Sequence, residues 1–299
     1  MKKYKYLKKC RLCQCKTDVI ISLGNIPIGN NLISKKKDSI QQEIFPLNIN
    51  NCINCNHYQL GISIDPKILY AKNYTYLSGI GSTFIKHFKN YSNWISKKIK
   101  LKKSDLILDI GSNDGTCLSF FQKQNFLVCG VDPANKPASI ANENGIFTFN
   151  EFYSKKTNKK IIKKFQKKPS LITSHNVLAH IDNLRKVFIN SYDLLDNGGY
   201  FCFEVGYFKK VLEKKLFDTV YHEHLDYHHA NPLINFLFKI GFSIVEISTN
   251  NIQGGTIRIL CKKINSKKIS PQVKNFIDKE RKSILFNKQL IARKIKESK

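Results

Sequence analysis

A short apolar run that leads into a glycine turn, DLILDIGSNDGTCLSFF at 105–121, constrains the fold of this chain more than any other segment. The apolar residues before Gly111 predict a buried strand, and the apolar spacing after Gly115 predicts the start of a helix. Strand, glycine turn and helix in this order are typical of α/β sheets, where ligands bind at the carboxyl ends of the strands. We therefore expect an α/β domain whose ligand lies over this turn.

Further segments have the length and composition of strands. They lie at 126–134, 169–181, 198–207, 242–248 and 254–262. Helical patterns separate the earlier strands, which predicts a largely parallel sheet covered by helices. The last two segments are joined only by a short loop, so we expect an antiparallel hairpin at one edge of the sheet.

Two C-x-x-C pairs, Cys10 with Cys13 and Cys52 with Cys55, stand near the N-terminus. Each pair can present two thiolates from one tight turn, and four thiolates complete a tetrahedral zinc shell. Strand-like residues between the pairs predict a small β structure, and the alternative is that the cysteines are buried without metal. A closed four-cysteine site has no open coordination position, so we expect this zinc to be structural.

The glycine turn itself indicates the kind of ligand. Its pattern is D-x-G-x-x-x-G from Asp109 to Gly115, not the G-x-G-x-x-G of dinucleotide-binding domains. Gly111 allows a ligand to approach the backbone, and Asp132, after the next expected strand, can accept hydrogen bonds from ribose hydroxyls. A pyrophosphate would be poorly accommodated beside Asp114, whereas a sulfonium cation that carries an ammonium and a carboxylate would fit better.

This turn resembles motif one of the class I S-adenosylmethionine-dependent methyltransferases. The resemblance implies a Rossmann-like α/β fold with S-adenosylmethionine as cofactor. The residues expected around this methyl donor are Asp109, Gly111, Asn113, Gly115, Asp132, Pro133 and Asn176. The alternative that the residues alone leave open is an α/β domain with an ordinary glycine turn.

The net charge of +28 raises the question of a nucleic-acid partner. The lysines are scattered, without an arginine cluster or a basic strand with interleaved aromatic residues, so we attribute the charge to compositional bias. No apolar run reaches the length of a membrane span, and no apolar stretch follows the charged start MKKYKYLKKCRLCQC. We therefore expect a cytoplasmic protein, with no membrane partner and no disulfide framework among its nine cysteines.

Several motifs together resemble one family, the deoxysugar C-methyltransferases, which act on nucleotide-linked 4-keto sugars. The matching segments are CRLC, CINC, LGNIPIGNNLIS, YTYLSGIGSTFIKH, ILDIGSNDGTCL, GVDPA, HNVLAHI, FEVGYF, LFDTVYHEHLDY and QGGTIRI. We accordingly expect a zinc-binding domain at 1–75, a methyl-donor domain at 76–265 and a helical tail at 266–299.

The resemblance also implies the residues of the site and a nucleotide-linked sugar as substrate. The paired cysteines match the zinc ligands, and the active-site positions match Tyr76, His180, Tyr221, Glu223 and His224. Two departures from the family's pattern concern the substrate. The family's C-terminal domain, which helps to hold the nucleotide sugar, is expected to be missing, and Gln253 stands where a histidine is common.

Carbon methylation beside a ketone needs a base for the α-proton and donors for the enolate oxygen. The segment TVYHEHLDYHHA at 219–230 collects groups of this kind. We expect His224 to be the base, with Glu223 fixing its tautomer or raising its basicity. The other active-site residues would bind the substrate and hold the enolate.

Other interpretations of this segment remain open. We interpret His222, His228 and His229 as surface or helix-start residues, and a second metal at His222, His224 and His228 is a weaker alternative. The reaction could instead be O- or N-methylation of another acceptor, including RNA, although such an enzyme needs no enolising pair like Glu223 and His224. A third alternative is an inactive homologue truncated at its C-terminus.

Overall fold

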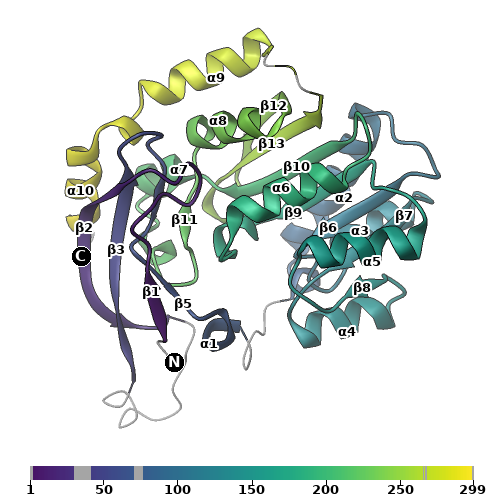
Figure 1. The fold of residues 1–299 in the computed structure, drawn as a ribbon, viewed down its shortest axis with the longest axis horizontal. Coiled ribbons are helices and arrows are strands. Elements are labelled where there is room, and N and C mark those ends of the chain that lie inside the picture. Colours follow the sequence, from purple (N-terminus) through teal and green to yellow (C-terminus); the bar gives the residue numbers. More distant parts are fainter. Residues whose placement is uncertain (1–2, 30–41, 71–76, 265, 267, 298–299) are drawn as a thin grey trace.

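The computed structural model of the protein describes residues 3–29, 42–70, 77–264, 266 and 268–297. Within these residues the strands form one large sheet, a four-stranded sheet and a two-stranded sheet. Figure 1 shows the large sheet with its helices beside the long strands of the N-terminal region.

The large sheet has, within the described residues, seven strands in the order β12–β13–β10–β9–β6–β7–β8. Their bounds are β6 (Leu106–Ile110), β7 (Leu127–Val131), β8 (Thr148–Phe149), β9 (Leu171–His175), β10 (Tyr200–Gly206), β12 (Phe242–Asn250) and β13 (Thr256–Lys263). Strands β6 to β10 run parallel, and β13 is antiparallel to both of its neighbours. The predicted parallel sheet with a late antiparallel hairpin is confirmed, with β12 at the edge and β13 inside it.

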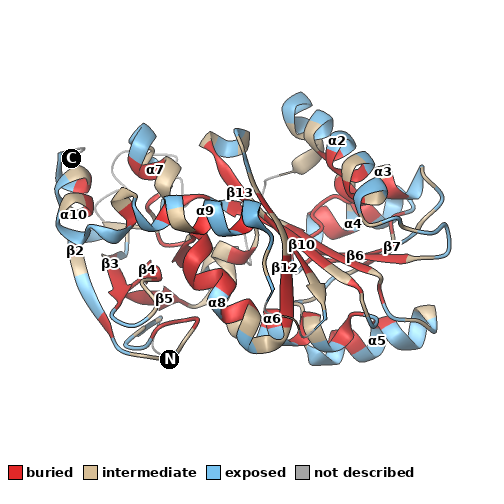
Figure 2. Cartoon of the chain, turned by 90° about the horizontal axis from the view of Figure 1, so that it is seen from above, coloured by how far each residue is buried: buried red, intermediate tan, exposed pale blue. Residues whose placement is uncertain are grey.

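Helices cover both faces of this sheet (Figure 2). They are α2 (Ser82–Lys98), α3 (Thr116–Gln122), α4 (Asn135–Glu143), α5 (Lys155–Phe165), α6 (Leu184–Leu194) and α8 (Ala230–Ile240). Because side chains alternate along a strand, Leu106 and Leu108 of β6 pack with α5, α6 and α8, whereas Ile107 packs with α2, α3 and α4. The sheet is therefore buried on both sides, as a parallel sheet requires.

The N-terminal region forms the two smaller sheets. β1 (Tyr4–Tyr6) pairs with β5 (Ile62–Ile64), and the four-stranded sheet has the order β11–β4–β3–β2. Its strands are β2 (Thr17–Pro27), β3 (Ile44–Cys52), β4 (Tyr58–Leu60) and β11 (Asp226–Tyr227). The β structure predicted between the cysteine pairs is confirmed as the antiparallel pair β2–β3. The unexpected member is β11, which comes from far along the chain and pairs with β4.

One hydrophobic cluster runs through both parts of the molecule. Leu12, Ile49 and Leu60 of the N-terminal region belong to the same buried cluster as Phe203 of β10 and Leu233 of α8. Each such buried side chain contributes about 1.5–3 kcal/mol, before strain and entropy are counted. The N-terminal region is thus packed onto the large sheet by apolar contacts.

The remaining helices complete the chain. They are α1 (Pro66–Tyr70), α7 (Phe208–Lys214), α9 (Pro271–Arg281), α10 (Lys288–Lys296) and the short 3-10 helices η2 (Ser78–Ile80), η3 (Leu178–His180), η4 (Phe217–Thr219), η5 (Ile252–Gly254) and η6 (Ile284–Phe286). The last helix, α10, returns to lie beside β2 (Figure 1), and Tyr58 Oη donates a 2.6 Å hydrogen bond to the Leu285 carbonyl. None of the helices in the described part of the chain is long and apolar enough to cross a membrane.

Candidate active site

The four paired cysteines converge on one point beside the N-terminal sheet. The turn after Cys10 is held by the amides of Leu12 and Cys13, which both donate to Cys10 Sγ over 3.4 Å. A matching turn follows β3, where the Cys55 amide donates to Cys52 Sγ over 3.5 Å. The two turns bring all four sulfur atoms within 4.8 Å of one another.

The spacing of these sulfur atoms suits a metal and not a disulfide. Sγ of Cys10 lies 3.6 Å from that of Cys55, and Sγ of Cys13 lies 3.3 Å from that of Cys52, whereas a disulfide bond is about 2.05 Å long. Zn–S bonds of about 2.3 Å in a tetrahedron place sulfur atoms at roughly these separations. The Cys55 thiol donates to Cys10 and lowers the pKa of Cys10 to about 4, so the site already favours a thiolate. The predicted zinc ligands therefore fit this ion.

The glycine turn after β6 adopts a backbone that few residues tolerate. Gly111 and Gly115 have φ angles of 74° and 77°, and Asn113 between them has 52°, all in the left-handed region. A Cβ atom on Gly111 would also lie only 2.3 Å from Cγ2 of Val177. Glycine is thus required there both by conformation and by the close approach of the segment that follows β9.

Asp132, at the end of β7, holds this turn in place. Its Oδ2 accepts a 2.9 Å hydrogen bond from the Asn113 amide, and its Oδ1 accepts one of 2.8 Å from the Ala134 amide. Each carboxylate oxygen can accept a second bond, so ordering the turn leaves capacity for ribose hydroxyls. Pro133, which was also expected near the donor, is exposed.

Three buried oxygens around the turn have no hydrogen-bond partner among the described residues: Asp109 Oδ1, Ser112 Oγ and Asn176 Oδ1. Buried polar atoms are normally bonded, so these oxygens indicate a ligand that carries donors. Burial, together with the nearby Asp132, raises the pKa of Asp109 well above its usual value, and a cationic ligand would favour the ionised form. S-adenosylmethionine, which carries an ammonium and ribose hydroxyls, fits this set of acceptors.

A short helix that the sequence analysis did not foresee covers the turn. The Ser78 amide of η2 donates to Asn113 Oδ1 over 2.9 Å, and the Gly79 amide donates to Asp114 Oδ2 over 2.7 Å. A Cβ atom on Gly79 would lie 2.9 Å from Asp114 Oδ2. Asp114 therefore anchors the segment that closes over the turn.

Three of the residues predicted to act on the methyl acceptor, which form the acceptor side of the site, lie together. The rings of His180 and His224 are 4.7 Å apart, those of Tyr221 and His224 are 4.5 Å apart, and Tyr221 Oη is 3.4 Å from His224 Nε2. His180 ends η3, three residues after Val177, whose side chain packs against Gly111. One short segment therefore connects the turn expected to hold the methyl donor, from Asp109 to Gly115 (the donor turn), to the cluster of His180, Tyr221 and His224 (the histidine cluster).

Backbone carbonyls fix the tautomers of both histidines. His224 Nδ1 lies 2.7 Å from the Thr219 carbonyl, and His180 Nδ1 lies 3.0 Å from the Glu223 carbonyl. A carbonyl only accepts, so each Nδ1 carries the proton and each neutral ring keeps its lone pair on Nε2. Burial lowers the pKa of His224, and burial with the neighbouring His224 lowers the pKa of His180 to about 3. Both rings are therefore neutral near pH 7.

Glu223 and Tyr76 complete the predicted acceptor-side residues. Glu223, which stands between His222 and His224 in the sequence, is buried. The group bonded to Nδ1 of His224 is the Thr219 carbonyl and not a carboxylate. An effect of Glu223 on the basicity of His224 stays a prediction. Tyr76 lies outside the described residues, so its part in the site also stays a prediction.

The expectation that His222, His228 and His229 are surface residues is wrong. All three are buried, because the pairing of β11 with β4 draws this segment between the two parts of the molecule. His229 does stand at a helix start, as the N-cap of α8. Among the described residues, no group with metal-ligand spacing contains His222, His224 and His228, which gives the second-metal alternative no support.

A buried charged cluster that the sequence analysis missed lies at the ends of β9 and β10. Glu204 Oε2 is 2.6 Å from His87 Nε2 and 3.1 Å from His175 Nδ1, while Oε1 accepts from Arg258 and Asn250 over 2.6 and 3.1 Å. Burial raises the pKa of Glu204, but the bonds from His175 and His87 and the charge of Arg258 bring it well below the usual value. The available signal was an acid inside the otherwise apolar run FCFEV.

Comparison with known proteins identifies both parts of the chain. Residues 86–247 match the family described as "Methyltransferase domain", and residues 10–70 match the family described as "Putative zinc binding domain". The C-methyltransferase NovU of Streptomyces niveus is 28% identical over 252 residues, which cover 84% of this chain. The match covers 60% of NovU, so this chain spans well under the full length of that relative.

Solved structures show a weaker likeness. An S-adenosylmethionine-dependent methyltransferase from Clostridium acetobutylicum has a TM-score of 0.49 and 15% identity, over 60% of this chain and 92% of that one. The magnesium protoporphyrin IX methyltransferase of Synechocystis PCC 6803 with bound S-adenosylmethionine has a TM-score of 0.44 and 12% identity, over 60% and 79%.

The family match extends over more than half of the chain, and it contains the donor turn and the parallel strands β6 to β10 of the large sheet. The second match coincides with the four cysteines that converge at one point. The chain belongs to the methyltransferase-domain family: it combines a methyltransferase domain, which has the class I S-adenosylmethionine-dependent fold, with an N-terminal four-cysteine zinc-binding domain.

Proposed function

We propose that this protein transfers a methyl group from S-adenosylmethionine to the carbon beside the ketone of a nucleotide-linked keto-deoxysugar. The observation that carries the proposal is the cluster of His180, Tyr221 and His224, in which two neutral histidines lie beside a phenol and next to the donor turn. The C-methyltransferase relative and the motifs of the deoxysugar family support the same chemistry.

In this proposal His224 is the base. Its Nε2 carries the lone pair, so it can take the α-proton of the substrate, while the Nδ1–H bond to the Thr219 carbonyl holds the resulting imidazolium in place. The Tyr221 hydroxyl, beside Nε2, donates to the developing enolate oxygen. His180 has its proton on Nδ1, so its Nε2 accepts from a sugar hydroxyl instead of donating to the enolate.

S-adenosylmethionine, when bound, supplies the electrophilic methyl group. The enolate carbon forms the new C–C bond as the C–S bond of the donor breaks, and His224 releases its proton to solvent. Asp109, Asp132 and Asn176 hold the donor through the acceptor oxygens described above, beside the open backbone of Gly111. Glu223 raises the basicity of His224 through its charge, and Tyr76 completes the substrate contacts.

The proposal can be tested by separating proton abstraction from methyl transfer. In heavy water, with S-adenosylhomocysteine bound, the enzyme should exchange the α-hydrogen of nucleotide-linked 4-keto deoxysugars without methylating them. His224→Gln should lower both this exchange and the turnover by about a hundredfold or more, which is typical of a missing general base. Calorimetry should show an unchanged affinity for S-adenosylhomocysteine.

His222→Gln is the matched control, because His222 lies in the same segment but its ring contacts Phe45 and the Pro46 carbonyl. This variant should keep the exchange, as checked at a temperature where it is folded. Normal exchange in His224→Gln would assign the base to another residue. Methyl transfer to a sugar or other acceptor without any exchange would replace carbon methylation by O- or N-methylation.

A further inference from the structure

The segment that carries His224 is built into the sheet of the zinc-binding domain. β11 begins two residues after His224 and pairs with β4 through Asp226 and Gln59. The Leu60 amide donates to the Leu225 carbonyl over 3.0 Å, next to this pair. The segment that carries His224 therefore continues directly into an edge strand of the N-terminal sheet.

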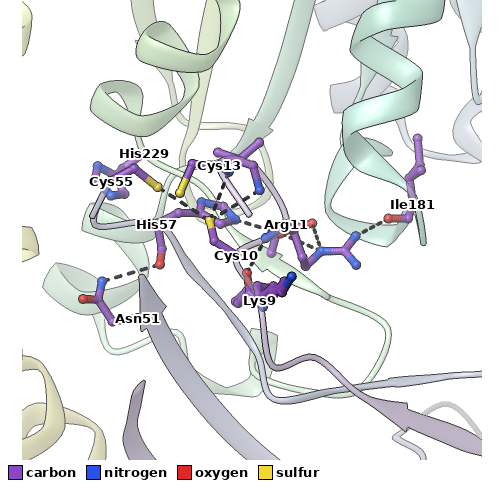
Figure 3. A network of polar contacts seen from close by, with 12 residues as sticks. Lys9, Cys10, Arg11, Cys13, Asn51, Cys55, His57, Ile181 and His229 are labelled. Carbon is purple, nitrogen blue, oxygen red and sulfur yellow. Dashed lines mark hydrogen bonds and ion pairs between the residues drawn. The ribbon is translucent and has the colours of Figure 1, made fainter. Parts of the chain in front are cut away.

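Arg11 extends from the zinc turn to this edge strand. It is buried and lies between two of the zinc ligands in the sequence, and Figure 3 shows its side chain leaving the cysteine cluster toward Ile181. Its Nε donates to both oxygens of Asp226 over 2.9 and 3.0 Å. Its Nη1 donates to the Asp182 carbonyl over 3.0 Å, and its Nη2 donates to the Ile181 carbonyl.

One guanidinium thus binds two segments that each continue from a histidine of the cluster. Ile181 and Asp182 directly follow His180, and Asp226 comes two residues after His224. The planar guanidinium carries five N–H donors in a fixed arrangement, so it can bond a carboxylate and two carbonyls from three different nitrogen atoms, whereas the three donors of a lysine share one nitrogen. Bonds between buried ionised groups are also stronger than neutral ones.

Other residues of the zinc-binding domain reinforce the same two segments. His57 Nε2 lies 2.8 Å from Asp226 Oδ1. Lys5 Nζ and Ser63 Oγ bond the two oxygens of Asp182, each over 2.8 Å. The segment after each histidine is therefore held from the N-terminal side at more than one atom.

We propose that Arg11 is a positioning residue. It reaches from the zinc site and sets the distance between His180 and His224. The zinc turn fixes where Arg11 starts, since Leu12 and Cys13 bond to Cys10 Sγ and the Arg11 amide donates to Gln59 Oε1 over 2.8 Å. The guanidinium then bonds both histidine segments, in addition to the direct bonds that join them from His180 Nδ1 to the Glu223 carbonyl and from the Leu225 amide to the Ala179 carbonyl. The zinc-binding domain is in this way part of the acceptor side of the active site, an inference whose catalytic consequence rests on the proposed function.

The test uses the zinc-loaded full chain and first needs no substrate. The rings of His180 and His224 lie 4.7 Å apart, so their protons should give a nuclear Overhauser effect in spectra of the eight labelled histidines. Arg11→Met should lose this effect and keep one zinc per chain. The matched control is Arg185→Met, because Arg185 of α6 also bonds the zinc turn, at the Leu12 carbonyl, and this variant should keep the effect.

Kinetics then separate positioning from general damage. Arg11→Met should lower kcat by about a hundredfold, as a misplacement of about 1 Å does, with the affinity for S-adenosylhomocysteine within about twofold of the wild type. Arg11→Lys, which keeps the charge but not all three bonds, should recover part of kcat and part of the ring contact. It also carries the comparison if Arg11→Met does not fold.

Each outcome decides one proposal. An intact ring contact in Arg11→Met, or in Arg11→Lys where that variant is the one that folds, overturns the positioning role, whether or not activity is lost. Loss of the contact in Arg11→Met but also in Arg185→Met overturns it as well, because any disturbance of the zinc turn would then suffice. Loss confined to the Arg11 variants, with no keto sugar turned over by the wild type, supports the positioning role and removes the proposed chemistry.

Discussion

The two sides of the active site are built in different ways. On the donor side, the turn from Asp109 to Gly115 is ordered by Asp132, a short distance along the same chain, and by the backbone conformation of its own glycines. On the acceptor side, the segments of His180 and His224 bond each other through the Glu223 carbonyl, and Arg11, from the other end of the chain, bonds both of them. Contacts between segments close in sequence shape the donor turn, whereas contacts between distant segments shape the acceptor side.

This difference predicts that the two sides fail separately. Removing one partner of a buried ion pair such as Arg11–Asp226 costs about 3–5 kcal/mol of stability, because the other partner stays buried as an uncompensated charge. The donor turn has no bond to the zinc turn among those described, so damage at the N-terminus should leave it intact. The predictions below test this separation.

Removal of zinc should have the largest effect. Binding of a structural zinc contributes on the order of 10 kcal/mol to local folding, so its loss should release the turns at Cys10 and Cys52, and with them Arg11. We expect exchange of the sugar's α-hydrogen and turnover to fall below detection. Calorimetry should show an affinity for S-adenosylhomocysteine within about threefold of that of the zinc-loaded protein. Amide hydrogen exchange should increase in the N-terminal sheet and at β11 and stay unchanged at β6. Equal loosening of β6 would show that the two sides are not separable.

For the same physical reason, the sequence predicted where the donor turn lies in the fold. A strand, a glycine turn and an acid after the next strand are local patterns, and each constrains its own backbone, so the places of Gly111 and Asp132 in the fold followed from their spacing. The cysteine pairs were equally clear because two C-x-x-C turns leave few alternatives for four thiolates.

The acceptor side could be assigned only by resemblance. Nothing in the run YHEHLDYHH shows that β11 would join a sheet more than 150 residues earlier, so His222, His228 and His229 were expected at the surface. The role of Arg11 depends on the same long-range pairing. Tertiary contacts between distant segments leave no periodic signal along the chain, which is why this part of the site needed the structure.

Asp132→Ala should have the next largest effect, on the donor side alone. The change removes acceptors for the Asn113 and Ala134 amides and for the ribose, and a hydrogen bond to a charged group is worth about 1.5–3 kcal/mol. Affinity for S-adenosylhomocysteine should fall by roughly ten- to a hundredfold, and the ring contact between His180 and His224 should remain. The control is Asp105→Ala, just before β6, whose carboxylate bonds the Lys102 amide and the Ser170 hydroxyl, away from the donor turn.

Glu280→Gln should destabilise the fold more than it alters either side. Glu280 of α9 is buried and accepts from the amides of Ala230 and Asn231 over 2.8 and 2.7 Å, which caps α8 behind β11. We expect the free energy of unfolding to fall by about 2–3 kcal/mol in urea titrations, with donor-product affinity unchanged. A neutral result would mean that α9 is not coupled to the rest of the fold.

The stability that Glu280 contributes should depend on pH, in a direction set by the pKa of its carboxyl group. Burial raises the pKa of Glu280, but the bonds from His229, Asn231 and Ala230 outweigh it and lower the pKa to about 2. Since the folded pKa lies below the unfolded value, the carboxylate stabilises the fold above about pH 4.5, and this contribution is lost as the pH falls toward 2. The stability difference between wild type and Glu280→Gln should shrink over that interval.

The smallest predicted effect concerns the pH profile of hydrogen exchange in the wild type. A solvated histidine with a pKa near 6.5 would lose about half of its base form at pH 6.5. Burial lowers the pKa of His224, so its neutral form persists to a lower pH than that of a solvated histidine, and the exchange rate should fall at a correspondingly lower pH. In Arg11→Met the exchange that remains should fall at higher pH, closer to 6.5, because a displaced His224 gains water. A profile that falls at the same pH in both proteins would mean that Arg11 leaves the surroundings of His224 unchanged, and the acceptor side would then be as locally built as the donor side.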